Sequence, residues 1–160
     1  MALEFKLLVL LVMANGAPII ARHLLGNCCA WPLDGGHTTS AGKPLLGPSK
    51  TLRGLAAAVV STSALAPLLG ISWRWGAAIG GLAMLGDLIA SFTKRRLGYP
   101  PSSQAIGLDQ IPESLVPLLV IAPAFDLNIW SVCLVVLAFT LVVPLLSRIF
   151  FLLGIRRRPY

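Results

Sequence analysis

Long stretches of the chain are apolar on every helical face, and short polar patches separate them. A membrane-spanning helix needs about 20 mostly apolar residues at a rise of about 1.5 Å per residue. Five stretches reach or approach this length: residues 3–25, 54–71, 75–92, 114–127 and 129–155. The pattern predicts an all-α polytopic membrane protein of about five transmembrane helices, in which residues 1–160 form a single integral-membrane domain.

Three of these stretches have features of their own. The fourth contains Pro117 and Pro123, so we expect a short, kinked or partly re-entrant helix. The third is crowded with small residues, which let neighbouring backbones approach closely, so we expect it to lie at the centre of the packing. The first resembles a secretory signal, but Glu4 and Lys6 cancel in charge and the apolar pattern continues beyond residue 18. An uncleaved first helix is therefore favoured.

Lysine and arginine residues gather on one side of this five-span arrangement. Most lie in the loops at about 26–53 and 93–113 or in the carboxyl-terminal tail, whereas the opposite side carries only Lys6 and Arg74. Loops rich in positive charge are retained in the cytoplasm. We therefore expect a multi-pass protein of the cytoplasmic (inner) cell membrane, with its amino terminus outside and its carboxyl terminus in the cytoplasm.

The composition narrows the classes of function. Of the 160 residues, 56% are hydrophobic and 12% are charged, whereas a soluble domain carries about 25% charged residues. The net charge of +7 does not indicate nucleic-acid binding, because the basic residues lie beside apolar spans rather than along one soluble face. The three cysteines predict no disulfide framework, and Cys28 and Cys29 form no convincing zinc site with His23 or His37.

A first polar cluster lies at the cytoplasmic end of the third span. Asp87, Ser91 and Lys94 are spaced by four and three residues, which places them on one helical face. Lys94, Arg95 and Arg96 alone are typical of a basic anchor to anionic lipid. Asp87 lies about one turn inside the apolar span, where an ionisable group implies a polar pathway, a partner or an ion. A local ion pair between Asp87 and Lys94 is the alternative.

A second cluster, Asp109 and Gln110, precedes the fourth span. Asp109 alone fits a helix cap, but together with Asp87 it could hold one or two magnesium ions. A third cluster runs from Asp34 to Lys50, Thr51 and Arg53. Its glycines and cations suit a polyphosphate, although the spacing of a phosphate-binding loop is absent. A turn at Asp34 and an ordinary positive flank before the second span are the simpler interpretations.

These residues resemble the CDP-archaeol synthases and their bacterial relatives, which are distantly related to the CDP-diacylglycerol synthases. The resemblance lies in residues 14–18, 32–36, 42–54, 86–98 and 108–110, and the Asp87-x-x-x-Ser91-x-x-Lys94-Arg95 pattern is its most specific part. It implies an enzyme that joins CTP to a lipid phosphate, archaetidic-acid-like or phosphatidic-acid-like, and releases pyrophosphate with the help of Mg²⁺. CTP, the lipid phosphate and membrane lipids would be the partners, and a homo-oligomer is compatible with this.

The same resemblance implies the roles of the polar residues. Asp87 and Asp109 would hold the metal, and Lys94 and Arg95 would join them as catalytic residues. The residues expected to bind substrate are Asn15, Asp34, Lys50, Thr51, Arg53, Ser91, Arg96 and Gln110. For Asn15, inside the first span, a polar contact between helices is the simpler interpretation.

Two other functions stay open at this point. Asp87 could be a coupling residue of a small membrane transporter, although the chain shows no inverted repeat and its charges gather at one face. Another lipid-phosphate-processing enzyme is the second alternative.

Overall fold

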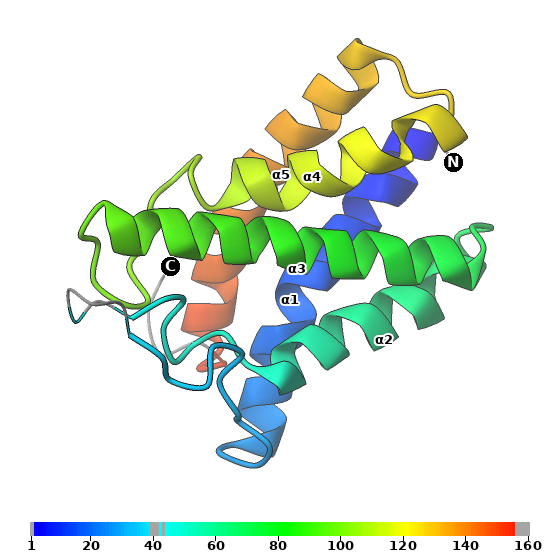
Figure 1. Cartoon of the computed structure of the whole chain (residues 1–160). Coiled ribbons are helices and arrows are strands. Elements are labelled where there is room, and N and C mark those ends of the chain that lie inside the picture. Colours follow the sequence, from blue (N-terminus) through cyan, green and yellow to red (C-terminus); the bar gives the residue numbers. More distant parts are fainter. Residues whose placement is uncertain (1, 39–41, 43, 156–160) are drawn as a thin grey trace.

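The structure, a computed structural model, describes residues 2–38, 42 and 44–155. Five α-helices and one 3₁₀ turn follow each other along this part of the chain (Figure 1). They are α1 (Leu3–Leu25), α2 (Leu52–Leu68), α3 (Trp73–Arg96), α4 (Gln110–Ile121), η1 (Ala122–Ala124) and α5 (Ile129–Leu152). Within the described residues there is no β-sheet, only two isolated bridges, Pro32 with Thr51 and Thr38 with Pro44. The predicted all-α class is confirmed.

Three of these helices, α1, α3 and α5, are long and apolar enough to cross a membrane, whereas α2 and α4 are shorter apolar helices. That α2 and α4 also cross the membrane, which would give five spans, therefore stays a prediction. The fourth stretch is short and broken, as expected: α4 ends at Ile121 and a 3₁₀ turn containing Pro123 follows it. Proline lacks the N–H that would continue the helical ladder.

The helix ends differ from the expected ends by a few residues for local reasons. The Thr51 side chain accepts a hydrogen bond from the Gly54 N–H at 3.2 Å, so α2 begins earlier than expected. It ends earlier too, because Gly70 turns the chain with a φ of 72° and the Ile71 N–H closes back on the Ala66 carbonyl. The third helix continues through Arg96 rather than ending at residue 92, since basic residues are favourable in a last helical turn.

Helix α3 lies at the centre of the packing and contacts α1, α2 and α4, which confirms its expected position. Glycine makes two of these approaches possible. At Gly80 an added Cβ would lie 3.1 Å from the Ala58 carbonyl oxygen of α2, and at Gly86 it would lie 2.7 Å from the Glu113 Cα of α4. The distance at Gly86 is shorter than real Cβ contacts, and the distance at Gly80 is tighter than most of them, so the close packing depends on the missing side chains.

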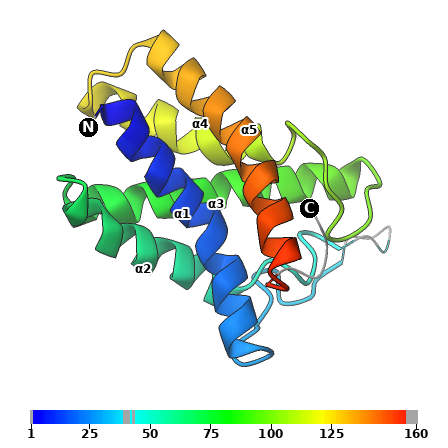
Figure 2. The same ribbon diagram turned by 180° about the vertical axis from the view of Figure 1, so that it is seen from behind.

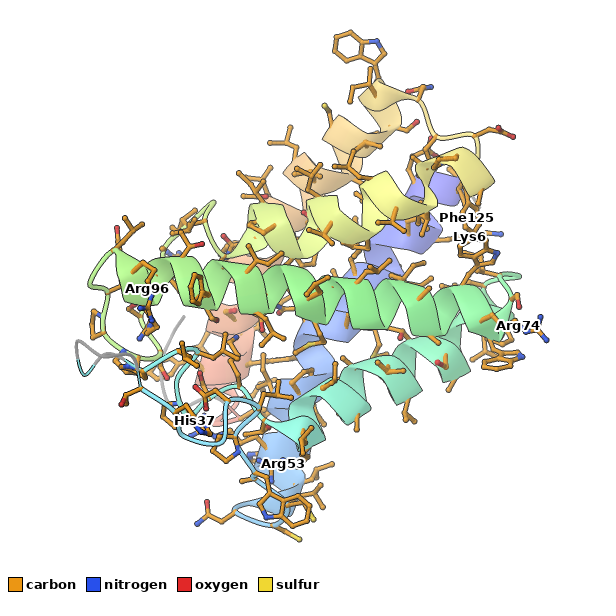
Figure 3. All side chains as sticks on the ribbon, in the orientation of Figure 1. Lys6, His37, Arg53, Arg74, Arg96 and Phe125 are labelled. Atoms are coloured by element: carbon orange, nitrogen blue, oxygen red, sulfur yellow. The ribbon has the colours of Figure 1, made fainter. Side chains whose placement is uncertain are left out.

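The polar loops gather at one end of the helices. The described residues of the loops 26–51 and 97–109 lie together at this end, beside the carboxyl end of α5, in both Figure 1 and Figure 2. Figure 3 places His37, Arg53 and Arg96 at the loop end and Lys6 and Arg74 at the opposite end. Lys43 and Arg156–Arg158, which contributed to the predicted orientation, lie outside the described residues. The orientation itself stays a prediction.

Candidate active site

The carboxyl-terminal half of α3 carries the central charged residues. Ser91, Lys94 and Arg95 are all buried there although two of them are cations, and Asp87 lies one turn further into the helix. Buried cations in an apolar helix need compensating partners, because each charge loses its hydration. The partners of Asp87 and Lys94 come from the two loops that meet this end of α3.

Lys50 joins the first of these loops to α3. Its ammonium lies 2.5 Å from the Asp87 carboxylate, across 37 positions of the sequence. The two side chains are 18% and 20% exposed, so this ion pair can be reached from solvent. The loop is held in place by the Leu33 N–H, which donates to the Lys50 carbonyl at 2.8 Å. Two polar clusters that are distant in the sequence thus share one site.

Lys94 joins the second loop to α3. Its ammonium lies 2.5 Å from the Asp109 carboxylate and donates to the Ser103 carbonyl at 2.8 Å. Asp109 also accepts a hydrogen bond from the Ala105 N–H at 2.8 Å. Asp109 stands at the start of α4 but makes no side-chain cap there. The ordinary capping interpretation of Asp109 and the local ion pair between Asp87 and Lys94 are therefore both wrong.

Arg95 differs from its neighbour Lys94. Its side chain is 4% exposed, and its Nε and Nη1 atoms have no hydrogen-bond partner among the described residues. The Asp109 charge acts on Arg95, but that carboxylate already binds Lys94. A buried guanidinium without hydrogen-bond partners lowers the stability of the fold, and its planar N–H donors match the oxygens of a phosphate. The two cations beside one carboxylate favour an anionic ligand at this end of α3.

Glu113 is a site residue that the sequence analysis missed. It lies in the first turn of α4 and is 3% exposed, and the Asn15 side chain donates to both of its carboxylate oxygens at 3.0 Å. The Asp87 and Lys50 charges act on it as well. An acidic residue directly before an apolar stretch was the available signal. The Asn15 bond confirms the polar contact between helices, and its role in substrate binding stays a prediction.

Asp34 organises the glycine-rich loop. Its carboxylate accepts hydrogen bonds from the backbone N–H groups of Gly36 and Leu46 at 3.0 Å and of Gly47 at 3.2 Å. Partial burial opposes its ionisation, but these hydrogen bonds outweigh burial and hold the pKa of Asp34 below its ordinary value of 3.8. The turn interpretation of Asp34 is confirmed.

The remaining predicted substrate-binding residues also have structural partners. Thr51 caps α2, and Gln110 accepts a hydrogen bond from the Gly107 N–H at 2.8 Å. Arg53 donates to the carbonyls of Gly26 and Cys28. Arg96 donates to the Pro44 carbonyl at 3.2 Å, and its guanidinium lies 4.8 Å from the centre of the Phe92 ring. Direct substrate contacts by these residues stay predictions.

The donor set of the site suits a divalent metal ion that is shared with a phosphate substrate. Asp87 and Asp109 each already hold a cation, the ammonium group of a lysine. The described residues contain no group of three or more histidine, cysteine or acidic side chains in a metal-binding arrangement. Mg²⁺ typically uses one or two protein carboxylates and completes its shell with water and substrate phosphates. The carboxylates present fit that kind of binding.

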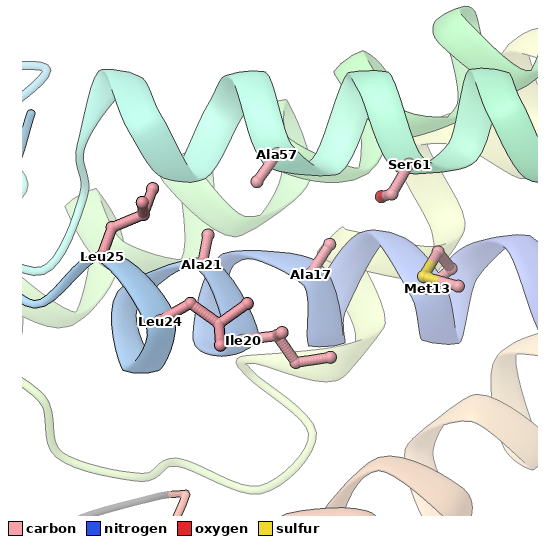
Figure 4. Close-up of a pocket in the computed structure, with 8 residues that line it drawn as sticks. All are labelled: Met13, Ala17, Ile20, Ala21, Leu24, Leu25, Ala57 and Ser61. Atoms are coloured by element: carbon pink, nitrogen blue, oxygen red, sulfur yellow. The ribbon is translucent and has the colours of Figure 1, made fainter.

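An apolar groove runs between α1 and α2 toward the loop end. Its volume is about 430 Å³, and it is lined by Met13, Ala17, Ile20, Leu24, Ala57 and neighbouring side chains (Figure 4). A second apolar groove of about 280 Å³ lies between α4 and α5, beside Leu115 and Val136. Grooves with apolar walls suit hydrocarbon chains.

The chain is similar to enzymes of lipid synthesis. Residues 75–160 match the CDP-archaeol synthase (CarS-like) family. The CDP-archaeol synthase of Sulfurisphaera tokodaii is 41% identical over 117 residues, which cover 69% of this chain and 70% of that protein. That of Hyperthermus butylicus is 39% identical over 61% of this chain and 59% of its own length. That of Thermofilum pendens is 31% identical over 92% of this chain and 75% of its own length.

The likeness extends to three dimensions. A solved structure of an intramembrane enzyme for archaeal membrane lipids biosynthesis has a TM-score of 0.76 and 29% sequence identity to this chain. The match covers 91% of this chain and 92% of that structure. Apolar helices around a cluster of cations and carboxylates therefore define a membrane-embedded enzyme that acts on phosphate-bearing lipids.

This chain belongs to the CDP-archaeol synthase family. It is a nucleotidyltransferase, a CTP-dependent cytidylyltransferase that acts on a lipid phosphate. The predicted family and activity are confirmed. Enzymes of this kind generally require a divalent metal ion.

Proposed function

We propose that this enzyme transfers the cytidylyl group of CTP to the phosphate of an archaetidic-acid-like lipid, in the cytoplasmic membrane and with Mg²⁺ as its metal. The observation that carries the proposal is the paired arrangement of Lys50 with Asp87 and Lys94 with Asp109 at one end of the helices. It is supported by the relatives, which are named CDP-archaeol synthases. The loop end would face the cytoplasm, where CTP is available.

The reaction is an attack by an oxygen of the lipid phosphate on the α-phosphorus of CTP. A phosphorus–oxygen bond to the lipid phosphate forms, the bond between the α- and β-phosphates breaks, and pyrophosphate departs with the bonding electrons. A phosphate monoester is already ionised near neutral pH, so the attack needs no separate general base. The main obstacle is repulsion between two anions, which cationic groups reduce.

Different residues of the site would have different roles in this reaction. Asp87 and Asp109 would hold Mg²⁺, which neutralises phosphate charge and stabilises the leaving pyrophosphate. Arg95 would donate its unmet N–H groups to phosphate oxygens. Lys50 would bind the polyphosphate, because its ammonium would be released from Asp87 if that carboxylate held the metal. Lys94 would keep the second loop against α3.

The remaining predicted contacts lie around this centre. Ser91 lies on α3 one turn from both Asp87 and Arg95 and would bind a phosphate oxygen through its hydroxyl. The lipid tail would occupy the groove between α1 and α2, because that groove is apolar and ends near Leu25, at the loop end of α1. The phosphate of the lipid would then lie at the loop end, on the same side as the charged cluster.

The test is conversion of labelled CTP by the purified full chain in the presence of Mg²⁺. Unsaturated archaetidic acid, phosphatidic acid and a polyprenyl phosphate are offered separately, and a labelled CDP-lipid is expected with archaetidic acid. Asp87→Asn should abolish the product, whereas Asp126→Asn is the matched control. Asp126 lies near η1, at the other end of α4, and asparagine tolerates its φ of 50°. Product formed only from another lipid would overturn the proposed substrate.

A further inference from the structure

Cys28 and Cys29 form a pair of thiols directly after α1. Their Sγ atoms are 3.6 Å apart, and both side chains are exposed. Neighbouring side chains of an extended chain point to opposite sides. Here Cys29 has a φ of 51°, a left-handed conformation that few residues other than glycine adopt. This turn brings both sulfur atoms to the same side of the backbone.

We propose that Cys28 and Cys29 form a dithiol site for a thiophilic centre of bent geometry, represented by trivalent arsenic. Bonds from such a centre to thiolate sulfur of about 2.3 Å, the length found for zinc thiolates, would meet at about 103° across this separation. That angle suits a pyramidal centre. A two-coordinate linear ion would need the sulfur atoms further apart. The separation therefore favours chelation by both thiols rather than reaction at one.

The site is connected to the charged cluster through Arg53. The Arg53 guanidinium donates to the Cys28 carbonyl at 2.5 Å and to the Gly26 carbonyl at 3.0 Å. Arg53 belongs to the first turn of α2, three residues after Lys50, whose ammonium binds Asp87. A ligand held by both thiols would add bulk beside these carbonyls and disturb their contacts with Arg53. Binding of a ligand to both thiols should therefore loosen the first turn of α2. It should also lower the rate of cytidylyl transfer, and this second effect alone rests on the proposed function.

Phenylarsine oxide is the probe for binding. Its reaction with the pair is balanced without an oxidant: two sulfur–arsenic bonds form, the arsenic–oxygen bond breaks, and the two thiol protons leave with that oxygen as water. Arsenic stays trivalent. A dithiol such as 2,3-dimercaptopropanol can reverse the reaction by exchange, whereas a monothiol at the same thiol concentration competes poorly with a chelate.

Mass spectrometry of the purified full chain should show one tightly bound equivalent of the probe. Cys28→Ser and Cys29→Ser should each abolish binding that resists a monothiol. Cys133→Ser should retain it, because Cys133 is a lone exposed cysteine on α5 and serves as the matched control. Retention by Cys28→Ser or Cys29→Ser, or loss in Cys133→Ser, would overturn the dithiol site.

The connection to the charged cluster has two readouts. Hydrogen exchange should become faster by several-fold in the first turn of α2 when the probe is bound, and this measurement needs no CTP. Cytidylyl transfer should fall by several-fold and recover with the dithiol, and Cys133→Ser should behave like the unmodified sequence. Unchanged exchange with the probe bound would overturn the connection, whether or not the proposed lipid is the substrate.

Discussion

The side-chain nitrogen of Asn15 lies 3.0 Å from each carboxylate oxygen of Glu113, and this contact joins α1 to α4 across 98 positions of the sequence. Glu113 is 3% exposed, so its carboxylate depends on protein donors in place of water. A buried polar group that loses its partner costs more than the intact hydrogen bond contributes. Asn15 is therefore a structural partner of the site, although its helix α1 is separated from α3 in the chain by α2.

We predict that Asn15→Leu lowers the free energy of unfolding by about 1–3 kcal/mol, because it leaves the Glu113 carboxylate without this donor. The double variant Asn15→Leu/Glu113→Leu should lose less, since both polar groups are gone. Unfolding in mixed micelles with increasing denaturing detergent measures both. A double variant that is less stable than Asn15→Leu would show that the pair does not act in this way.

Asp87→Asn should lower turnover by a factor on the order of 10² or more, because the amide neither holds a metal ion nor balances Lys50. The amount of protein in the membrane should stay unchanged. Initial rates at saturating CTP and at increasing Mg²⁺ measure the effect. Turnover equal to that of the Asp126→Asn control would remove Asp87 from the proposed metal site.

Gly86→Ala should separate α3 from α4 and destabilise the fold, because the added Cβ would lie 2.7 Å from the Glu113 Cα and 2.5 Å from the Pro112 carbonyl carbon. Overpacking of this kind typically costs about 1–3 kcal/mol. The matched control is Gly81→Ala on the same helix, where the Cβ would meet the Val59 side chain at an ordinary 4.0 Å. Equal thermal stability of the two variants would contradict the tight contact.

Folding of the glycine-rich loop should depend on pH through Asp34. The folded-state pKa of Asp34 is lowered, so its contribution to stability is present above the ordinary pKa of 3.8 and is lost as the pH falls through the folded-state value. Hydrogen exchange of the Leu46 and Gly47 amides, corrected for its intrinsic pH dependence, should accelerate in that acidic range. In Asp34→Asn this pH-dependent step should disappear, and its persistence would assign it to another group.

Ala57→Trp should raise the KM for long-chain lipid phosphates by several-fold, because the indole would fill the groove between α1 and α2. The KM for CTP and the rate with a short-chain lipid phosphate should change little. Val136→Trp fills the other groove and is the matched control. If only Val136→Trp impairs the long-chain substrate, the tail lies between α4 and α5.

The apolar pattern predicted the helices well because a span is a local property of the sequence. The apolar pattern does not predict where each helix begins and ends. At Thr51, the hydroxyl caps α2 and moves the start of the helix before the apolar run. At Arg96 the end of α3 was missed for another reason, because a helix can continue past the last apolar residue when its last turn is basic.

The partners of the charged residues could not be predicted from spacing. Asp87 and Lys94 lie on one helical face, which suggested a local pair, yet Asp87 binds Lys50 and Lys94 binds Asp109. Both partners are in loops whose path depends on long-range contacts, such as the Leu52 N–H bond to the Trp31 carbonyl. Glu113 was missed for the same reason, because its importance depends on the contact between α1 and α4.

In the resting enzyme, the two lysine–carboxylate pairs neutralise the opposite charges of the site. Lys50 and Lys94 serve as counter-ions for Asp87 and Asp109, so these charges can rest beside a low-dielectric membrane without exposing a strong field. When a nucleotide binds together with its metal ion, a carboxylate of these pairs would exchange its lysine for the metal, and the released ammonium would bind a phosphate. Because each new ionic contact would replace an existing one, no charged group of these pairs would be left without a counter-ion while the substrate enters.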